Sequence, residues 1–386
     1  MIHIKSKLSH CSLKKVAILC QLPESWGNVH SVWQALIDCP DISVTVIVLP
    51  FIHKDYEWER QRTEEYLDFL NVPYVGWDEI NIREAGFSGV VFTSPYDETR
   101  PSEYSFKALK DVIPYTVYIP YGLEVGGGGL NIALQYCQPA AADSSAVFVR
   151  SDAARAMYEK YCPRGAEHVY VYGHPRMDGF FNFEDFSVDP GLLEEINGRT
   201  AVLWNAHFSF DEDLWSTFDI FAFDILEACA ERPDIALIFR PHPLLWKKLI
   251  NVGAFDRSGI ELLKLELQRK GVILDERVDH RHAFKASAAM LSDVGTFLME
   301  YLAVGKPCLY LVNPHGLGLN EEGKKVVENY RSAATAWEIC EFLDEVSSGS
   351  CLFNIDEVAV KDFFHIFDGC AGNRIAHHVR AGLLNE

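Results

Sequence analysis

Short apolar runs, each followed by a stretch of polar, Gly or Pro residues, recur along the whole chain. In the first half they predict strands at residues 15–22, 42–50, 87–92, 115–120 and 146–149. β-branched residues and Phe are frequent in these runs, and helical segments such as 29–38 lie between them. This alternation of strand, loop and helix predicts a doubly wound parallel sheet of the Rossmann type.

The second half starts the same alternation again after a linker at 180–190. Its predicted strands are 200–204, 235–239, 272–274, 289–292 and 308–312. Its predicted helices include 214–231, 264–269, 280–288, 321–348 and 355–386. We therefore predict two Rossmann-like domains, residues 1–190 and 191–386, the second with C-terminal helices. Because open α/β sheets bind ligands at the carboxyl ends of their strands, we expect a ligand cleft between the domains.

The charge of the chain narrows the choice of partners. The 386 residues carry a formal net charge of −20. Nucleic acids need clustered Lys and Arg, so this charge argues against a nucleic-acid partner and against a broad electrostatic membrane patch. A local basic pocket for one small anionic ligand is compatible with it.

The ten Cys are scattered without a CxxC pair, which favours free thiols in a reducing compartment. The N-terminus is polar and no run reaches about 18 apolar residues, so neither a signal peptide nor a membrane span is expected. We expect a cytoplasmic protein, with peripheral contact at the inner face of the cell membrane still open. Metal motifs and a GxGxxG fingerprint are absent from the sequence, so no metal and no cofactor are predicted.

The segment 292–310 reads as a loop, a short helix, a Gly-Lys-Pro turn and a strand. Ser292, Asp293 and Thr296 are N-cap residue types at the start of an apolar run, and Gly295 lies among them. A helix N-terminus presents free N–H groups and the positive end of the helix dipole. We predict that these four residues bind the diphosphate of a ligand. The alternative is an ordinary βα unit without a ligand.

Four further polar residues are placed to meet the same ligand. His242 lies between two prolines directly after a predicted strand, and Arg240 precedes it. His207 follows another strand in the same way, and both His are candidate catalytic groups. We interpret His242 as a base if its ring is neutral and as a group that stabilises a leaving phosphate if its ring is charged. Glu300 lies four residues after Thr296, on the same helical face, and is predicted to bind ribose hydroxyls. For the two His, the alternative is a loop residue that meets solvent or caps a helix.

The first domain supplies the predicted acceptor side. Tyr121, Gly122 and Glu124 follow a strand end, and four glycines follow at 126–129. Glu124 is a candidate base toward an acceptor hydroxyl, and the alternative is a solvated loop carboxylate. No Lys-Ser/Thr pair follows these glycines, so we interpret them as a mobile loop beside an acceptor site rather than a nucleoside-triphosphatase loop. Arg176, near the linker, is predicted to bind a phosphate through a bidentate contact. The alternative is an ion pair with the Asp two residues later that locks the hinge.

Four motifs follow one another in the chain: YGHPRMD (172–178), AVLWNAHFS (201–209), FRPHP (239–243) and LSDVGTFLMEYLAVGKPCLYL (291–311). Together they resemble the CDP-glycerol glycerophosphotransferase family of teichoic-acid and capsule biosynthesis, which has a GT-B fold. The resemblance covers roughly residues 170–315 and implies two domains facing a central cleft. It also implies that His242, Gly295 and Thr296 face the donor diphosphate, and Asp293 matches the family's Asp.

In the first domain the chain departs from that family. The family's Trp-His-Gly segment, whose His acts on the acceptor hydroxyl, is replaced by IPYGLEV (119–125). The resemblance implies a transferase that moves a glycerophosphate-like polyol-phosphate group from a CDP-linked donor to a glycan or lipid-linked acceptor. A UDP- or CDP-sugar glycosyltransferase or a UDP-sugar epimerase of the same architecture is one alternative. A catalytically inactive relative that binds a nucleotide-linked ligand or a partner protein is the other.

Overall fold

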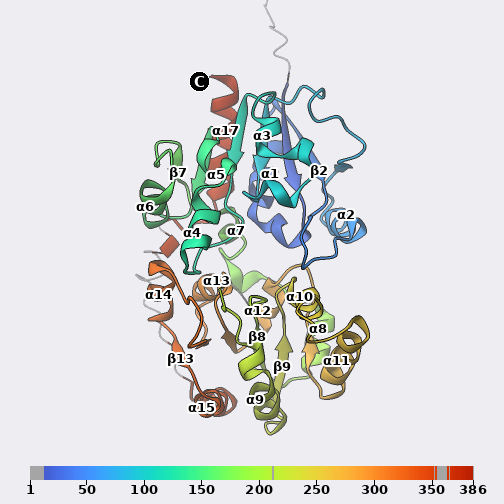
Figure 1. Cartoon of the computed structure of the whole chain (residues 1–386), viewed down its shortest axis with the longest axis vertical. Helices are drawn as coiled ribbons and strands as arrows, with labels where there is room; N and C mark the ends of the chain where they lie inside the picture. Colours follow the sequence, from blue (N-terminus) through green and yellow to red (C-terminus); the bar gives the residue numbers. More distant parts are fainter. Residues whose placement is uncertain (1–12, 211–212, 352, 354–362, 365, 386) are drawn as a thin grey trace, which may run out of the picture.

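The computed structural model describes residues 13–210, 213–351, 353, 363–364 and 366–385. This part of the chain forms two α/β domains stacked along the long axis of the molecule (Figure 1). The polar N-terminal segment with Cys11, and the part of the predicted C-terminal helices at 354–362, lie outside the described residues.

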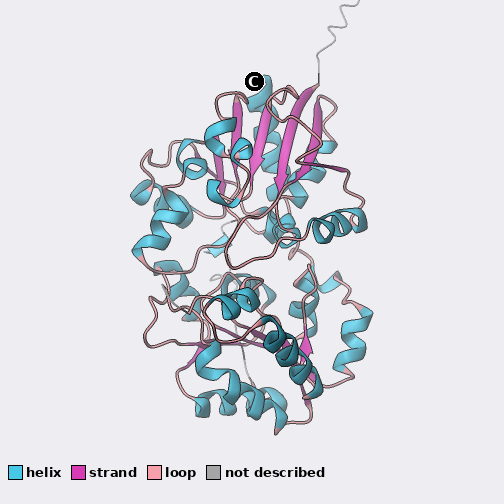
Figure 2. Ribbon diagram, turned by 45° about the vertical axis from the view of Figure 1, so that its right-hand side comes forward, coloured by secondary structure: helices cyan, strands magenta, loops and turns pink. Residues whose placement is uncertain are grey.

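The first domain contains a seven-stranded parallel sheet in the order β3-β2-β1-β4-β5-β6-β7 (Figure 2). Its strands are β1 (Lys14–Cys20), β2 (Ile42–Val48), β3 (Tyr74–Gly76), β4 (Gly89–Phe92), β5 (Tyr115–Tyr118), β6 (Ala146–Val149) and β7 (Val169–Val171). Its helices are η1 (Pro23–Asn28), α1 (His30–Ile37), α2 (Arg60–Phe69), η2 (Asp97–Thr99), η3 (Ser102–Tyr104), α3 (Phe106–Leu109), α4 (Gly129–Tyr136), α5 (Pro139–Asp143), α6 (Asp152–Tyr161) and α7 (Pro175–Asp178). The strand order reverses between β1 and β4, which is where open α/β sheets bind ligands.

The second domain contains a six-stranded parallel sheet in the order β10-β9-β8-β11-β12-β13. Its strands are β8 (Thr200–Asn205), β9 (Ile235–Phe239), β10 (Ile273–Leu274), β11 (Ala289–Ser292), β12 (Cys308–Leu311) and β13 (Arg331–Ala333). The helices that follow the hinge are η4 (Phe183–Asp185), α8 (Pro190–Ile196), α9 (Phe218–Ala230), α10 (Leu245–Asn251), α11 (Arg257–Arg269), α12 (Arg281–Ala286), α13 (Phe297–Val304), α14 (Glu321–Val327), α15 (Ala336–Ser347) and α17 (Ala371–Leu384).

Each sheet is buried on both faces, which explains its continuous apolar strands. Successive side chains of β1 enter different hydrophobic clusters, so that Ala17 packs on one face and Val16 on the other. In β8, Leu203 and Val202 divide in the same way between the two faces of the second sheet. Parallel sheets covered by helices on both sides have this pattern. The two predicted Rossmann-like domains are therefore observed.

Helix α17 returns from the second domain to the first (Figure 1, red). Ile375 and Val379 are fully buried in the cluster that also contains residues of β1 and α1. At Gly372, a Cβ atom would lie 2.4 Å from the backbone carbonyl carbon of Ser31, so α1 and α17 meet backbone to backbone. The sequence-based division at residue 190 assigns α17 to the second domain, whereas its packing places it on the first.

Three segments differ from the predicted elements. The charged residues at 53–71 predict an exposed helix, but residues 51–59 form a loop and α2 begins only at Arg60. Residues 321–348 contain strand β13 between two helices; this edge strand has two exposed residues out of three and no apolar pattern to reveal it. Residues 129–143 contain helices α4 and α5, which the neighbouring glycines conceal in the sequence.

Candidate functional site

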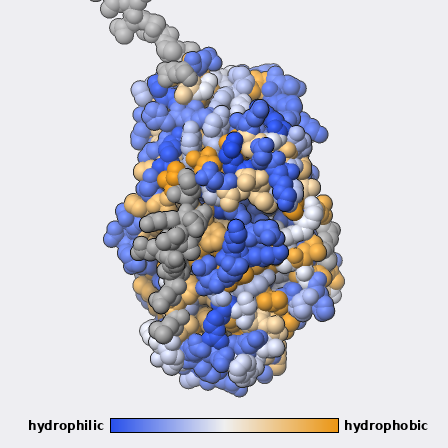
Figure 3. Space-filling view, turned by 90° about the vertical axis from the view of Figure 1, so that its left-hand side faces the viewer, coloured by the Kyte–Doolittle hydropathy of each residue, from blue (hydrophilic) through white to orange (hydrophobic). Residues whose placement is uncertain are grey.

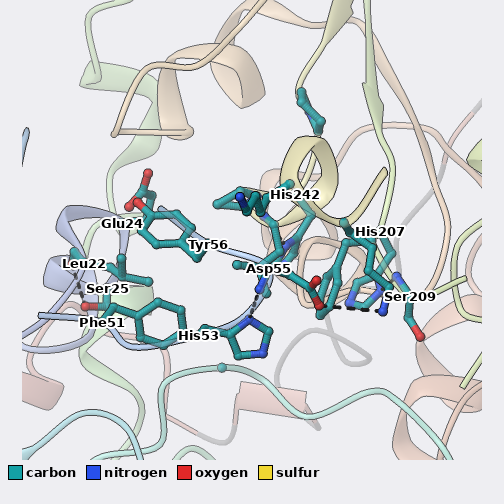
Figure 4. Close-up of a pocket in the computed structure, with 18 of the residues that line it drawn as sticks. Leu22, Glu24, Ser25, Phe51, His53, Asp55, Tyr56, His207, Ser209 and His242 are labelled. Atoms are coloured by element: carbon teal, nitrogen blue, oxygen red, sulfur yellow. Dashed lines mark hydrogen bonds and ion pairs between the residues drawn. The ribbon is translucent and has the colours of Figure 1, made fainter. Parts of the chain in front are cut away.

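A cleft of about 1100 Å³ lies between the two domains, at the carboxyl ends of both sheets (Figure 4). Residues of both domains line it, from the loops after β1, β2, β4 and β5 and after β8, β9, β10 and β11. Ligands of open α/β sheets bind in this position. The cleft therefore matches the predicted ligand site.

The N-terminus of helix α13 faces the cleft. Gly295, Thr296 and Phe297 line it, and within the described chain no hydrogen-bond acceptor contacts their backbone N–H groups. Free N–H donors at the positive end of a helix are suited to an anionic group. The structure thus places the predicted Gly295 and Thr296 in the cleft wall.

His207 and His242 lie side by side in the second-domain wall, with ring centres 5.1 Å apart (Figure 4). The backbone N–H of Ser209 donates to Nδ1 of His207 at 3.1 Å. The backbone N–H of Leu244 donates to Nδ1 of His242, also at 3.1 Å. A ring nitrogen that accepts a hydrogen bond carries no proton, so the proton of each neutral ring is on Nε2. Both rings can therefore donate an Nε2–H to a ligand.

Burial keeps both imidazoles neutral. Burial, together with His53 of the first domain, lowers the pKa of His242 to about 3. Burial and the neighbouring His242 lower the pKa of His207 well below its usual range. At neutral pH neither ring is a cation, and the nitrogen left free on each ring already carries a proton. The prediction that a neutral His242 acts as a base is therefore corrected: its geometry suits a hydrogen-bond donor to an anion.

Ser292 and Asp293 lie behind the cleft wall rather than in it. Asp293 is 1% exposed, and its carboxylate accepts from the backbone N–H of His207 at 2.8 Å. It also accepts from the backbone N–H of Thr217 at 2.8 Å and from the Thr217 hydroxyl at 3.2 Å. Ser292 is fully buried and donates to the carbonyl oxygen of Asp293. The prediction that these two residues bind the diphosphate is corrected, because Asp293 instead fixes the loop that carries His207.

Glu300 is also withdrawn from the cleft. It is fully buried, with Oε1 3.2 Å from Nη1 of Arg176 and Oε2 2.7 Å from Nε2 of His280. Burial alone would raise the pKa of Glu300, but Arg176 and His280 lower it to about 2. Because both oxygens are engaged, the prediction that Glu300 binds ribose hydroxyls is corrected. The carboxylate instead links Arg176 of α7 to His280 at the start of α12, and so joins both to α13.

The two predicted phosphate-binding arginines line the cleft and are already hydrogen-bonded. Arg240 donates from Nη1 to the Asp275 carboxylate at 2.7 Å. Arg176 donates from Nε to the side-chain oxygen of Asn28 at 2.8 Å, in addition to its bond with Glu300. A guanidinium group has five N–H donors, so each arginine keeps donors for a ligand. Asp178 accepts instead from Ser31 and from the first two amides of α17, so the alternative Arg176–Asp178 pair is not formed.

The predicted acceptor residues lie on the first-domain wall. The hydroxyl of Tyr121 is 3.1 Å from that of Tyr96, and the two rings are edge to face with centres 5.7 Å apart. Gly122 reaches the second domain, because a Cβ atom there would lie 3.0 Å from Cγ2 of Thr296. The structure therefore brings the predicted acceptor side into contact with the α13 N-terminus.

The four-glycine segment packs against the second domain. The N–H of Gly127 donates to the carbonyl oxygen of Gly318 at 2.9 Å, and Gly126 forms a β-bridge with Leu319. A Cβ atom at Gly127 would lie 2.8, 3.1 and 3.2 Å from the carbonyl oxygens of residues 317–319. These glycines therefore allow two backbones to approach closely, which corrects their interpretation as a mobile loop.

Glu124 lies in the same loop and lines the cleft. The side-chain amide of Asn320 donates to its backbone carbonyl oxygen at 2.9 Å. Burial raises the pKa of the Glu124 carboxyl group to about 7, although Arg150 nearby lowers it. A carboxyl group that titrates near neutral pH in a cleft is a candidate for proton transfer.

Sequence reasoning missed the loop between β2 and α2. His53 from this loop lines the cleft (Figure 4). Asp55 accepts from Nδ2 of Asn251 at 2.8 Å and pairs with Lys248 at 3.6 Å. These contacts join the first domain to α10, the helix that follows His242. The charged residues around this loop resemble an exposed helix in the sequence. Its position directly after a predicted strand was the signal that could have identified it.

Within the described chain, no helix is long and apolar enough to cross a membrane. The same residues contain no group of three or more His, Cys, Asp or Glu side chains that could hold a metal ion. On the face shown in Figure 3, polar residues dominate and apolar residues are scattered.

Two Rossmann-like domains with a cleft at the carboxyl ends of both sheets define a GT-B-like protein. S. aureus MnaA with UDP has a TM-score of 0.63 and 14% identity, covering 97% of this chain and 98% of that one. The UDP-GlcNAc 2-epimerase of Neisseria meningitidis bound to UDP-GlcNAc has a TM-score of 0.62 and 12% identity, covering 97% and 100%. The wall teichoic acid polymerase TagF soaked with CDPG has a TM-score of 0.60 and 11% identity, covering 96% and 89%.

No protein-family model and no curated protein sequence matches this chain. Identities of 11 to 14% to the solved structures show a shared fold alone. The predicted GT-B fold is therefore confirmed. The CDP-glycerol glycerophosphotransferase family is not, because the similar structures include UDP-GlcNAc 2-epimerases as well as TagF.

Proposed function

We propose that this protein is an enzyme that transfers a sugar from a nucleoside diphosphate to a hydroxyl group of a second molecule. The diphosphate binds at Gly295 and Thr296, beside His207, His242 and Arg240. The acceptor, a glycan or a lipid-linked hydroxyl compound, enters on the first-domain side of the cleft. The proposed reaction uses no cofactor.

The observation that carries this proposal is a set of uncharged N–H donors gathered in one wall of the cleft. This set consists of the backbone N–H groups around Gly295 and Thr296 and the Nε2–H groups of His207 and His242. Fixed donors of this kind stabilise the negative charge that develops on a diphosphate when its bond to a sugar breaks. Fold relatives solved with UDP and with UDP-GlcNAc support a uridine-linked donor.

The size of the cleft favours two substrates. Pockets for one small molecule typically measure about 300–1,000 Å³, and this cleft is at the upper end or beyond at about 1100 Å³. Transfer needs room for a donor and an acceptor, whereas epimerisation needs room for one nucleotide sugar. Epimerisation remains the second candidate, because UDP-GlcNAc 2-epimerases share the fold over nearly the whole chain.

The nucleotide product distinguishes the candidate reactions. Sugar transfer from UDP-GlcNAc releases UDP, because the bond between the anomeric carbon and the diphosphate breaks. Epimerisation converts UDP-GlcNAc into its 2-epimer without net UDP release. Transfer of a polyol phosphate from CDP-glycerol, which the four motifs and the TagF fold favour, releases CMP because the bond between the two phosphates breaks. Release of one UDP for each sugar transferred to the acceptor supports the proposal. Formation of the 2-epimer alone, or of CMP alone, overturns it.

A variant of the donor wall tests the site itself. His242→Ala removes one hydrogen bond to a charged group, which is worth about 1.5–3 kcal/mol. We expect the affinity for UDP-GlcNAc to fall at least about 10-fold in calorimetry, with an unchanged circular dichroism spectrum. His315→Ala serves as the control, because His315 is exposed and outside the cleft. Equal affinity of the two variants would exclude His242 from the donor site.

A further inference from the structure

Glu124 lies where the first domain touches the donor wall. Two positions before it, a Cβ atom at Gly122 would lie 3.0 Å from Thr296; two positions after it, a Cβ atom at Gly126 would lie 2.6 Å from the ring of Trp215. Trp215 in turn packs edge to face on His207, with ring centres 5.4 Å apart. The backbone of Glu124 is therefore fixed on both sides against elements of the proposed diphosphate site.

The carboxylate of Glu124 is free to meet a ligand. It lines the cleft, and within the described chain no other residue donates a hydrogen bond to it. Asn320 of the second domain donates only to the backbone carbonyl oxygen of Glu124 and not to its carboxylate. A carboxylate that faces a cleft without a protein donor retains its acceptor sites for a substrate proton.

The surroundings of this carboxylate are rich in tyrosine side chains. Five tyrosines are close enough to interact with its charge: Tyr96, Tyr118, Tyr121, Tyr136 and Tyr158. The hydroxyl of Tyr118 is fully buried and has no hydrogen-bond partner among the described residues. Such surroundings disfavour the charged form of a carboxyl group and so raise its affinity for a proton.

The nearby cation is committed elsewhere. Arg150, at the end of β6, forms a buried ion pair with Glu322 of α14 and donates to the carbonyl oxygen of Phe363 at 2.7 Å. Arg150 attracts and Glu322 repels a negative charge on Glu124. Because Glu322 holds the guanidinium, Arg150 neutralises Glu124 only in part.

We propose that Glu124 is the acid–base residue of the cleft and accepts the proton of the acceptor hydroxyl. This inference rests on the proposed sugar transfer. The acceptor oxygen forms a bond to the anomeric carbon, and its proton moves to the Glu124 carboxylate. The bond from the anomeric carbon to the diphosphate oxygen breaks, and its electron pair leaves with the nucleoside diphosphate. Glu124 then returns the proton to solvent.

Glu124→Gln tests the role directly in the full-length protein, with UDP release from UDP-GlcNAc as the readout. We expect kcat to fall at least about 100-fold while the affinity for UDP stays within about 2-fold. Because a base must be ionised to work, the wild-type rate falls as the pH drops below about 7, and this limb disappears in the variant. Glu98→Gln is the matched control, since Glu98 is an exposed carboxylate in the same wall.

Glu322→Gln tests whether the proton affinity of Glu124, rather than a structural role of Glu124, sets the pH dependence of the rate. This variant removes one negative charge and releases Arg150 to pair with Glu124, so the acidic limb of the rate profile should move to lower pH with the plateau rate kept. A purely structural role for Glu124 would leave the position of this limb unchanged. A thermal unfolding transition in each variant confirms the native fold.

The failures of the two proposals are distinguishable. If wild-type protein neither binds nor cleaves the donor, the proposed function fails and the role of Glu124 fails with it. If the protein cleaves UDP-GlcNAc and Glu124→Gln keeps the wild-type rate or pH profile, only the role of Glu124 is overturned.

Discussion

At the residue scale, four histidines share one local arrangement. In His53, His174, His207 and His242, the ring Nδ1 accepts the backbone N–H of the residue two positions later. The arrangement assigns the proton of each neutral ring to Nε2. In His174 this Nε2–H is bonded to the carbonyl oxygen of Pro120 at 2.8 Å, whereas His53, His207 and His242 line the cleft. Three neutral N–H donors from both domains are thus available to one ligand.

Because these hydrogen-bond donors are neutral, we predict that the affinity for the nucleotide-sugar substrate changes little with pH. The pKa of His242 is lowered to about 3, so the ring stays uncharged between about pH 6 and about pH 8. The disubstituted diphosphate of UDP-GlcNAc keeps its charge over the same range. Glu124→Gln protein lacks one of the two carboxyl groups that titrate near neutral pH beside this wall; the other is Asp293, whose pKa burial raises to about 7 and which lies behind the wall on the amides of His207 and Thr217. Because neither His207 nor His242 changes charge, the dissociation constant in this variant should change less than about 2-fold in calorimetry. Binding that weakens steadily as pH rises through about 6.5 would show that imidazolium ions hold the diphosphate.

The sequence predicts some of these residues and misses others for a physical reason. His207, His242, Gly295 and Thr296 are found because they directly follow strands, and strand ends meet at the cleft. Asp293 is also near a strand end, but its carboxylate turns toward the amides of His207 and Thr217. Residue type and helical spacing do not state which way a side chain points, and that direction depends on partners far along the chain.

At the element scale, the loop from β5 to α4 shows how glycine can serve contact between domains. A Cβ atom at Gly127 would lie 2.8 Å from a carbonyl oxygen of the second domain, whereas one at Gly129 would have no atom within 4 Å. Neither glycine has a positive φ angle, so backbone strain does not distinguish them. The difference between them is the approach of the second domain alone.

This contrast predicts opposite outcomes for two alanine variants. Gly127→Ala must push the loops at 126–127 and 317–319 apart, and we expect it to cost about 1–3 kcal/mol of unfolding free energy. Gly129→Ala, at the first residue of α4, should be neutral or slightly stabilising because alanine favours a helix. Urea unfolding measures both. Equal stability of the two variants would contradict a tight contact at Gly127.

The fold itself is more predictable than its contacts. Long apolar strands such as β1 and β8 are evident from the sequence because both faces of a parallel sheet are buried. The edge strand β13 is short and mostly exposed, so nothing in its residues distinguishes it from a loop. The glycines before α4 suggested flexibility, because a sequence does not show that another backbone lies against them.

At the scale of the whole molecule, contacts at several places join the two domains. The buried Arg150–Glu322 pair lies behind the loop of Glu124, and the Asp55–Lys248 pair lies beside the loop of His53. Helix α17 adds a further connection, because the chain returns from the second domain and α17 packs into the core of the first. The core of the first domain is therefore complete only when α17 packs on it. We expect both domains to unfold together.

Two substitutions on α17 test this dependence. Val379 is fully buried in the first-domain core, whereas His377, on the same helix, is exposed. Val379→Asp buries an unpaired carboxylate, which we expect to destabilise the protein by more than about 4 kcal/mol. His377→Asp adds the same charge to the surface and should change stability by about 0.5 kcal/mol or less. If the domains are coupled through α17 and the buried pairs, calorimetry should show one transition that moves to lower temperature in Val379→Asp. A second transition that stays at the wild-type temperature would show that the second domain folds without α17.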